Sequence, residues 1–426
     1  MTILKWVGIV GAAGVAIALL VLAYLVASTD QRLGAQLAAI RAAGEPLSWG
    51  DLAAKPIPPE KNAAVFLRRA ESDLEAIFKE LSPIWDRRDY YDRPLSAEEQ
   101  KAVKAAFDAY PKVMPLLEQA AACQEFDREI DYATVASDLE GTLFDPTGKH
   151  RTVARVLTLR VYYLLSKSQY DEALRDSILL MRVARHFERE PMIVGYLVAV
   201  ACKTMGLMAA NDVLQAGPVS KELRKELDAE LARQDNLDGY RWAMRTERVY
   251  GMQQYAAIPA RNIWPIRAQW NYDESKYLWA MDEYLKSLSL SYADVKAARQ
   301  RMEAGLQGRF CTLASLVFPA IQASYDATVR TQALARCLRV SNALQARVPP
   351  GSDAVPKLSD LGLPAEATTD PFSGKPLVVK KLPDGWLVYS VGEDLEDSGG
   401  DIDSPRTRPK DYGFGPPSAK RKAAAK

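Results

Sequence analysis

Carboxylates are concentrated in one short stretch near the carboxyl end of the chain. They surround Ser398-Gly399-Gly400, a sequence that permits a tight reversal, and they are Glu393, Asp394, Glu396, Asp397, Asp401 and Asp403. Calcium prefers about six to eight oxygen ligands from carboxylates and backbone carbonyls on a bendable loop. The spacing differs from that of an EF-hand. From the residues alone, both a calcium site and a solvated acidic loop remain open.

Histidine, the residue most often used as a general base, occurs only at His150 and His186. His186 follows Arg185 and precedes Glu188 and Glu190, a pattern that indicates a charge network on a helix surface. The sequence contains no nucleophile elbow, HExxH zinc motif, P-loop or dinucleotide-binding motif. We therefore assign no catalytic and no cofactor-binding residue.

The cysteines and the net charge argue against two further classes of site. Cys123, Cys202, Cys311 and Cys337 are far apart and form no CxxC pair, which disfavours zinc. Buried thiols and disulfides both fit their spacing. The formal net charge of +1 gives no reason to expect a nucleic-acid partner.

An apolar segment opens the chain. Residues Trp6 to Val26 carry no charged side chain. About 20 helical residues are long enough to cross a hydrocarbon core of ~30 Å. The segment predicts a transmembrane signal anchor within residues 1–29, with the lipid bilayer as its partner through residues 6–26.

Cleavage and orientation are open in the sequence. Val26-Ala27-Ser28 is an acceptable cleavage site for a removable signal peptide, although the apolar segment is longer than such peptides need. Lys5 precedes the span, whereas Arg32 and Arg41 follow it, so the positive-inside rule is nearly balanced. Because the apolar segment is long, we expect an uncleaved anchor in the cell membrane. Because the N-terminal tail is short, we expect an exported C-terminal body.

The remainder of the chain predicts a mainly α protein. A membrane-proximal segment with a proline-rich linker covers residues 30–61, and an α-helical body covers residues 62–350. In the body, apolar residues recur at steps of three and four, the period of a helix with one buried face. Between Arg151 and Ala216 the pattern predicts three helices, of which the first two resemble one tetratricopeptide-type hairpin.

Breaks separate those three helices. Lys167-Ser168-Gln169 separates the first from the second, Glu190-Pro191 ends the second, and Gly217-Pro218 ends the third. The proline and glycine of the last two breaks are typical of helix ends.

A small module follows the helices at residues 351–403. Leu377–Val379 and Trp386–Tyr389 are short β-type runs joined by Leu382-Pro383-Asp384-Gly385, which has turn chemistry. They predict one β-hairpin, and we expect both aromatic residues of its second strand to pack onto the helical body. Residues 404–426 are rich in Pro, Gly, Lys and Arg and predict a disordered basic tail.

This module resembles the C-terminal region of the major pseudopilins of type II secretion. The matching segments, in order, are Asp370–Leu377, Tyr389–Asp394 and Gly399–Asp403. The resemblance implies a calcium-binding loop, with Asp394, Asp401 and Asp403 as metal ligands. It is confined to this module, because the N-terminus lacks the pseudopilin processing sequence.

The rest of the chain is similar to a set of uncharacterised bacterial single-pass membrane-anchored α-helical proteins. The similarity rests on Asp171-Glu172-Ala173-Leu174, Ala184-Arg185-His186, Glu190-Pro191 and the tail described above. The similarity brings no known activity. Because catalytic motifs are missing, we favour a membrane-anchored envelope protein with a helical scaffold or protein-binding body and an unidentified protein partner. The alternative is an enzyme of unrecognised type that uses the helical cleft.

Overall fold

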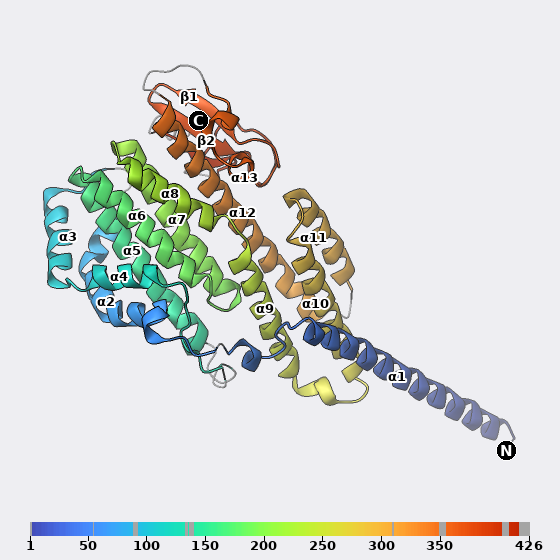
Figure 1. The fold of residues 1–426 in the computed structure, drawn as a ribbon. Coiled ribbons are helices and arrows are strands. Elements are labelled where there is room, and N and C mark those ends of the chain that lie inside the picture. The colour runs from blue at the N-terminus through green and yellow to red at the C-terminus, as the bar shows by residue number, and fades with distance from the viewer. Residues whose placement is uncertain are drawn as a thin grey trace. The chain divides into compact units, whose positions relative to one another are not determined.

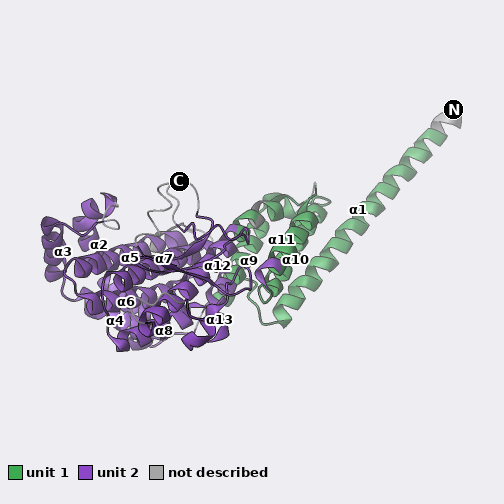
Figure 2. Cartoon of the chain, turned by 90° about the horizontal axis from the view of Figure 1, so that it is seen from above, with its two compact units in different colours: residues 1–52, 244–290, 294–322 green, residues 53–243, 291–293, 323–426 purple. Residues whose placement is uncertain are grey.

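The computed structural model describes residues 2–53, 55–87, 93–132, 135, 140–308, 311–348, 355–402 and 409–416. The chain divides into two units, which Figure 2 colours separately. Unit 1 comprises residues 1–52, 244–290 and 294–322, and unit 2 comprises residues 53–243, 291–293 and 323–426. The predicted helical body, residues 62–350, is therefore shared between the two units.

The described part of the chain is mainly α-helical, as the sequence predicts (Figure 1). Unit 1 contains α1 (Thr2–Ala42) and α10 (Arg267–Ser287), with a 3₁₀ turn, η4, at Pro259–Asn262. Three helices have residues in both units: α9 (Asp238–Ala256), α11 (Tyr292–Leu306) and α12 (Thr312–Arg347). Unit 2 contains α2 (Ala63–Arg87), α3 (Ala97–Ala109), α4 (Val113–Ala122), α5 (Asp145–Ser166), α6 (Tyr170–Phe187), α7 (Met192–Ala216), α8 (Lys221–Gln234) and α13 (Ala365–Thr368).

In unit 1 the N-terminal helix is longer than predicted. The sequence analysis placed the end of the anchor at residue 29, but α1 continues without a break to Ala42. No proline occurs before Pro46. In addition, Leu33 and Ile40 are buried, so the second half of α1 has an apolar face to pack. That half lies along α10. The exposed first half keeps the apolar composition of a candidate membrane span.

In unit 2 the helix breaks predicted between α5, α6 and α7 are confirmed. The three helices pack against one another around a core of aliphatic side chains. Ser168 between α5 and α6 has a positive φ of 56°, and Pro191 directly precedes α7. α7 is apolar and long enough to cross a membrane, but most of it is buried, as in the core helix of a globular unit.

The C-terminal module contains a three-stranded antiparallel sheet in the order β1-β2-β3. The predicted hairpin is confirmed: β1 (Val378–Leu382) pairs with β2 (Gly385–Ser390), and Leu382 lies opposite Gly385. The prediction of a disordered tail was wrong for β3 (Tyr412–Phe414), which pairs with β2. Tyr412 and Phe414 are buried, so a three-residue apolar alternation outweighs the polar composition around it.

The two aromatic side chains of β2 lie on opposite faces of the sheet. Trp386 and Val388 join the aliphatic core of unit 2, as expected for Trp386. Tyr389 packs with Leu387 and Ile402 in a separate cluster, so the expectation that it also packs onto the helices was wrong. Residues 386 and 389 are an odd number of positions apart, and alternate residues of a strand face opposite sides.

Candidate functional site

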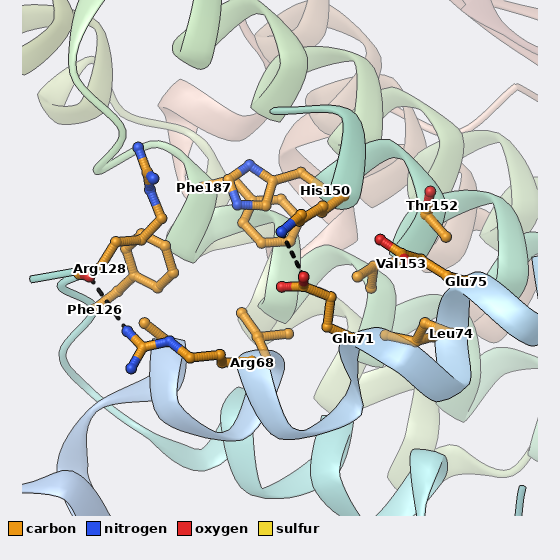
Figure 3. A pocket seen from close by; sticks show the side chains of 13 residues that line it. Arg68, Glu71, Leu74, Glu75, Phe126, Arg128, His150, Thr152, Val153 and Phe187 are labelled. Carbon is orange, nitrogen blue, oxygen red and sulfur yellow. Dashed lines mark hydrogen bonds and ion pairs between the residues drawn. The ribbon is translucent and has the colours of Figure 1, made fainter. Parts of the chain in front are cut away.

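A pocket of about 340 Å³ opens in unit 2 between α2, the segment before the π-turn Glu140–Phe144, and the start of α5 (Figure 3). Its apolar wall is formed by aliphatic side chains of α2 and α5 and by two phenylalanine rings, and charged side chains surround its mouth. The lining residues are Ala64, Leu67, Arg68, Glu71, Leu74, Glu75, Phe126, Arg128, Lys149, His150, Thr152, Val153 and Phe187.

Asn62 fixes two of the pocket walls to each other. Its Oδ1 accepts the backbone N–H of Ala64 at 3.1 Å, which caps the first turn of α2. The same oxygen accepts the N–H of Asp127 at 3.0 Å, and its Nδ2 donates to the Asp127 carbonyl at 2.8 Å. Asn62 is fully buried, so this bridge sets where Phe126 and Arg128 lie relative to α2. The sequence signal for it was an Asn three residues after the last proline of the linker.

The charges at the mouth of the pocket are paired with one another. Lys149 forms an ion pair with Glu71 of α2. The guanidinium of Arg68 donates to the Arg128 carbonyl at 3.2 Å and lies 3.5 Å from the carboxylate of Glu129. Figure 3 shows Arg68 and Glu71 on the α2 side of the pocket, with Arg68 directed toward Arg128. The mouth therefore presents both donors and acceptors and does not carry a single sign of charge.

A buried group of ionisable residues lies at the back of the pocket. Glu190 is 1% exposed, and its Oε2 accepts from Arg128 Nε at 2.9 Å. The Nε2 atom of His150 lies 3.4 Å from Glu190 Oε1. Burial raises the pKa of Glu190, and the Arg128 guanidinium partly opposes that shift.

Both histidines are neutral in this environment. Burial lowers the pKa of His150 from 6.5 to about 3, and that of His186 to about 4. His150 stacks on Phe187 with 3.8 Å between ring centroids, and His186 stacks on Phe126 at 6.0 Å. Among the described residues, Nδ1 of His150 has no hydrogen-bond partner. A polar ligand atom in the pocket could supply one.

The prediction of a helix-surface charge network around His186 was wrong. His186, Glu188 and Glu190 are all buried. The carboxylate of Glu188 pairs with Lys203 of α7, and that of Glu190 pairs with Arg128. The sequence pattern correctly indicated that ionisable side chains are close together here. It could not show that the partners come from helices and segments distant in the chain.

The acidic loop is organised by two carboxylates that the sequence analysis did not single out as ligands. Asp411 is fully buried and accepts the N–H groups of Ser398, Gly400 and Asp401 at 2.8–3.3 Å. Asp370, also buried, accepts from Ser390 Oγ at 2.7 Å and from the Val391 N–H at 3.2 Å. Both anchor the loop to the sheet through backbone hydrogen bonds.

The predicted calcium ligands are only partly described. Asp394 is exposed, and its Oδ1 accepts the Glu396 N–H at 3.1 Å. Asp401 is half-buried, and Asp403 lies outside the described residues. Within the described ranges no three His, Cys, Asp or Glu side chains are grouped as a metal site would require. Because Asp403 is not among them, calcium binding stays a prediction.

The four cysteines are all buried and reduced, so the thiol alternative holds and the disulfide alternative does not. Burial raises the pKa of Cys202 to about 12, which leaves the thiol protonated and unreactive near neutral pH. The Cys202 Sγ donates to the carbonyl of His150 at 3.7 Å, where it supports the backbone behind the pocket.

Comparison of the chain with protein-family models, with curated proteins and with solved structures finds no match.

Proposed function

We propose that this protein is a single-pass, membrane-anchored bacterial envelope protein whose helical unit 2 binds a short segment of a partner polypeptide in the pocket between α2 and α5. The pocket carries the proposal, because it combines an apolar floor with paired charges at its mouth. An apolar side chain of a peptide would occupy the floor, and its backbone and charged groups would meet Arg68, Glu71 and Lys149. The contact between α5 and α6, whose sequence resembles a tetratricopeptide-type hairpin, supports the same class of function.

The buried histidine favours binding over catalysis. A general base works best when its pKa is close to the working pH. With a pKa of about 3, the imidazole of His150 is a weak base at neutral pH. Its unpartnered Nδ1 can still accept a hydrogen bond from a ligand without taking the proton, and that is sufficient for binding.

The apolar first half of α1 supports membrane attachment, and export of the C-terminal body is part of the same proposal. An exported acidic loop would also meet free calcium, so the predicted ligands Asp394, Asp401 and Asp403 would need only modest affinity.

Site-directed photo-cross-linking in the producing bacterium tests the proposal. A photoreactive amino acid at Thr152, which lines the pocket, should give one discrete adduct that mass spectrometry assigns to a single polypeptide. The same amino acid at Lys101, exposed on α3 outside the pocket, is the matched control and should give no such adduct.

A second variant connects the adduct to the pocket itself. Leu67→Trp places an indole in the space between α2 and α5 and should abolish the adduct from position 152, while Lys101→Trp should leave it intact. Circular dichroism would establish that the Leu67→Trp protein is folded. An adduct that survives a filled pocket, or that forms equally from position 101, would contradict the proposal.

A further inference from the structure

An exposed apolar patch lies in unit 1 between η4 and α10. Ile263, Trp264 and Ile266 are 54%, 47% and 42% exposed. Such large apolar side chains, consecutive or nearly so, are costly to leave in water. We call this patch the 263–266 loop.

The 263–266 loop is placed by α1, because it directly precedes the part of α10 that packs against that helix. Arg267 Nε donates to Asp30 Oδ1 at 2.9 Å, and Asn271 also donates to Asp30. Further along both helices, Gln36 Nε2 donates to the Ser275 carbonyl at 3.1 Å. Residue numbers therefore increase in the same direction along α1 and α10. The 263–266 loop precedes Arg267, so it lies on the side of Asp30 that faces the apolar half of α1.

Side-chain exposure along α1 supports the same placement. Before Leu22, the described side chains of the apolar stretch are exposed. Leu22, Val26 and Thr29 are half-buried and share one helix face at steps of four and three. Unit 1 therefore begins to cover α1 inside the apolar stretch, at the depth where a membrane-spanning helix leaves the hydrocarbon.

We propose that the 263–266 loop is a second membrane contact, in which Trp264 and its two isoleucine neighbours insert into the interface of the same bilayer that α1 crosses. The inference rests on the proposed anchoring of α1. Tryptophan is favoured at the boundary between hydrocarbon and headgroups, because its ring is apolar and its N–H can meet water or lipid oxygens. Arg267 and Arg32 lie just beyond this level and are placed to meet lipid phosphates.

The contact would fix the orientation of unit 1 on the membrane. A single helix can rotate and tilt in a bilayer, and interfacial residues restrict both motions. With the 263–266 loop beside α1, the packed pair of α1 and α10 has two points of attachment instead of one.

Quenching by nitroxide-labelled lipids tests the inference on the full chain in vesicles of equal parts phosphatidylcholine and phosphatidylglycerol. The native cysteines are buried, so a fluorophore can be attached to a cysteine introduced at the surface. Three single variants are compared: Ile263→Cys, which keeps Trp264; Val10→Cys in the apolar half of α1; and Leu290→Cys. Leu290 is a matched control, being 52% exposed and following the far end of α10, ~30 Å away along the helix.

We expect a nitroxide near the headgroup to quench most of the fluorescence at position 263, a nitroxide near the chain end to quench position 10, and neither to quench position 290. Adding Trp264→Ser to Ile263→Cys should reduce the quenching at 263 and leave that at 10 unchanged. Quenching at 10 without quenching at 263 would overturn the second contact and leave the anchor standing. Absence of quenching at 10 would overturn the anchor itself, and the inference with it.

Discussion

Burial of the two histidines makes the stability of unit 2 depend on pH. In the unfolded chain a histidine titrates near pH 6.5, whereas in the fold the pKa of His150 is about 3 and that of His186 about 4. Below pH 6.5 the unfolded state binds protons that the folded state does not. The free energy of unfolding is therefore not reduced by the histidines above pH 6.5, and it falls as the pH decreases toward the folded pKa values. By roughly pH 5 the loss from His150 alone should be about 2 kcal/mol.

Thermal melting of the wild type and of His150→Phe between pH 7.5 and 5 measures this loss. Phenylalanine keeps the stacking on Phe187 but cannot bind a proton. We expect the Tm of the wild type to fall more steeply with decreasing pH than that of the variant. Parallel curves would mean that His150 is solvated and titrates as it does in the unfolded chain.

The Arg128–Glu190 pair should also be costly to break. Removing one partner of a buried ion pair leaves an uncompensated charge, which lowers the free energy of unfolding by about 3–5 kcal/mol. We expect Arg128→Met to lower the free energy of unfolding by that order at pH 7. Without the guanidinium the pKa of Glu190 rises further, so the variant's deficit should shrink as the pH falls toward the ordinary range of a carboxyl.

Denaturant unfolding of the Arg128→Met protein provides the measurement, and that of the separate Arg68→Met protein is its control. Arg68 lines the same pocket, but its side chain is 55% exposed and its pair with Glu129 is in water. Its loss should cost about 1 kcal/mol or less. Equal effects of the two substitutions would show that Glu190 is not held by Arg128.

Residue types were easier to predict than their partners. The sequence showed that His186, Glu188 and Glu190 are close together in the chain. However, Arg128 and Lys203 reach them from 62 and 15 positions away. Asn62 gives a local signal as a helix cap, but its bridge to Asp127 depends on a contact 65 positions distant. The pocket therefore could not be assembled from spacing alone.

At the scale of elements, signals close in the sequence made the helix boundaries predictable. The predicted boundaries at Gln169, Pro191 and Gly217 agree with the structure, because a residue that starts or stops a helix does so within one turn of its own position. The extension of α1 to Ala42 and the strand Tyr412–Phe414 were missed. Both depend on a buried face that only the tertiary partner supplies.

Close approach of α9 and α10 gives a prediction at this scale. A Cβ atom at Gly251 would lie 2.3 Å from the Tyr277 hydroxyl, which donates to the Glu247 carbonyl at 3.0 Å. Gly251→Ala should therefore separate the two helices and lower the stability by about 1–3 kcal/mol. Gly34→Ala is the control: α1 has open space there, so alanine should be neutral or stabilising by up to about 1 kcal/mol. Thermal melting compares them, and equal Tm values would contradict the close approach.

The acidic loop gives a prediction that separates a metal site from a solvated turn. If Asp394, Asp401 and Asp403 bind calcium, a hundredfold excess over Kd should stabilise the fold by about 2.7 kcal/mol. Asp394→Asn should remove the calcium-dependent rise in Tm. Glu396→Gln, an exposed neighbour outside the predicted ligand set, should keep it. If calcium and magnesium both leave the melting of the wild type unchanged, the loop is a solvated acidic turn that Asp370 and Asp411 hold without a metal.

At the scale of the whole molecule, the two units are discontinuous in sequence, and that is why the predicted domain boundaries differ from them. Unit 1 joins residues 1–52 to segments that begin at residue 244. Glu45 makes the connection by pairing with Arg245 and with Arg248, which is 2% exposed. Helical periodicity shows which face of a segment is apolar, but it does not show which distant segment covers that face.

The integration of α1 into unit 1 predicts that the mature protein keeps its N-terminus. The alternative cleavage site, Val26-Ala27-Ser28, lies inside a continuous helix, where Thr29 Oγ1 donates to the Leu25 carbonyl at 2.8 Å. Proteolysis favours exposed, irregular segments, so cleavage there would require α1 to unwind. We expect the intact mass of the membrane-bound protein to include residues 2–27. A chain beginning at Ser28 or Thr29 would show that the segment is a removable signal peptide.

Carbonate washing of membranes tests whether the retained segment spans the bilayer. The wild type should stay in the pellet, because release would expose about 20 apolar residues to water. Placing two charges in the span, with Val15→Arg and Leu19→Arg, should cost about 2.5–3.5 kcal/mol each and move the protein into the supernatant. Ala38→Arg, on an exposed face of the same helix beyond the span, should leave the wild-type pellet unchanged. If the double variant remained in the pellet as completely as the wild type, membrane attachment would have to come from another part of the chain.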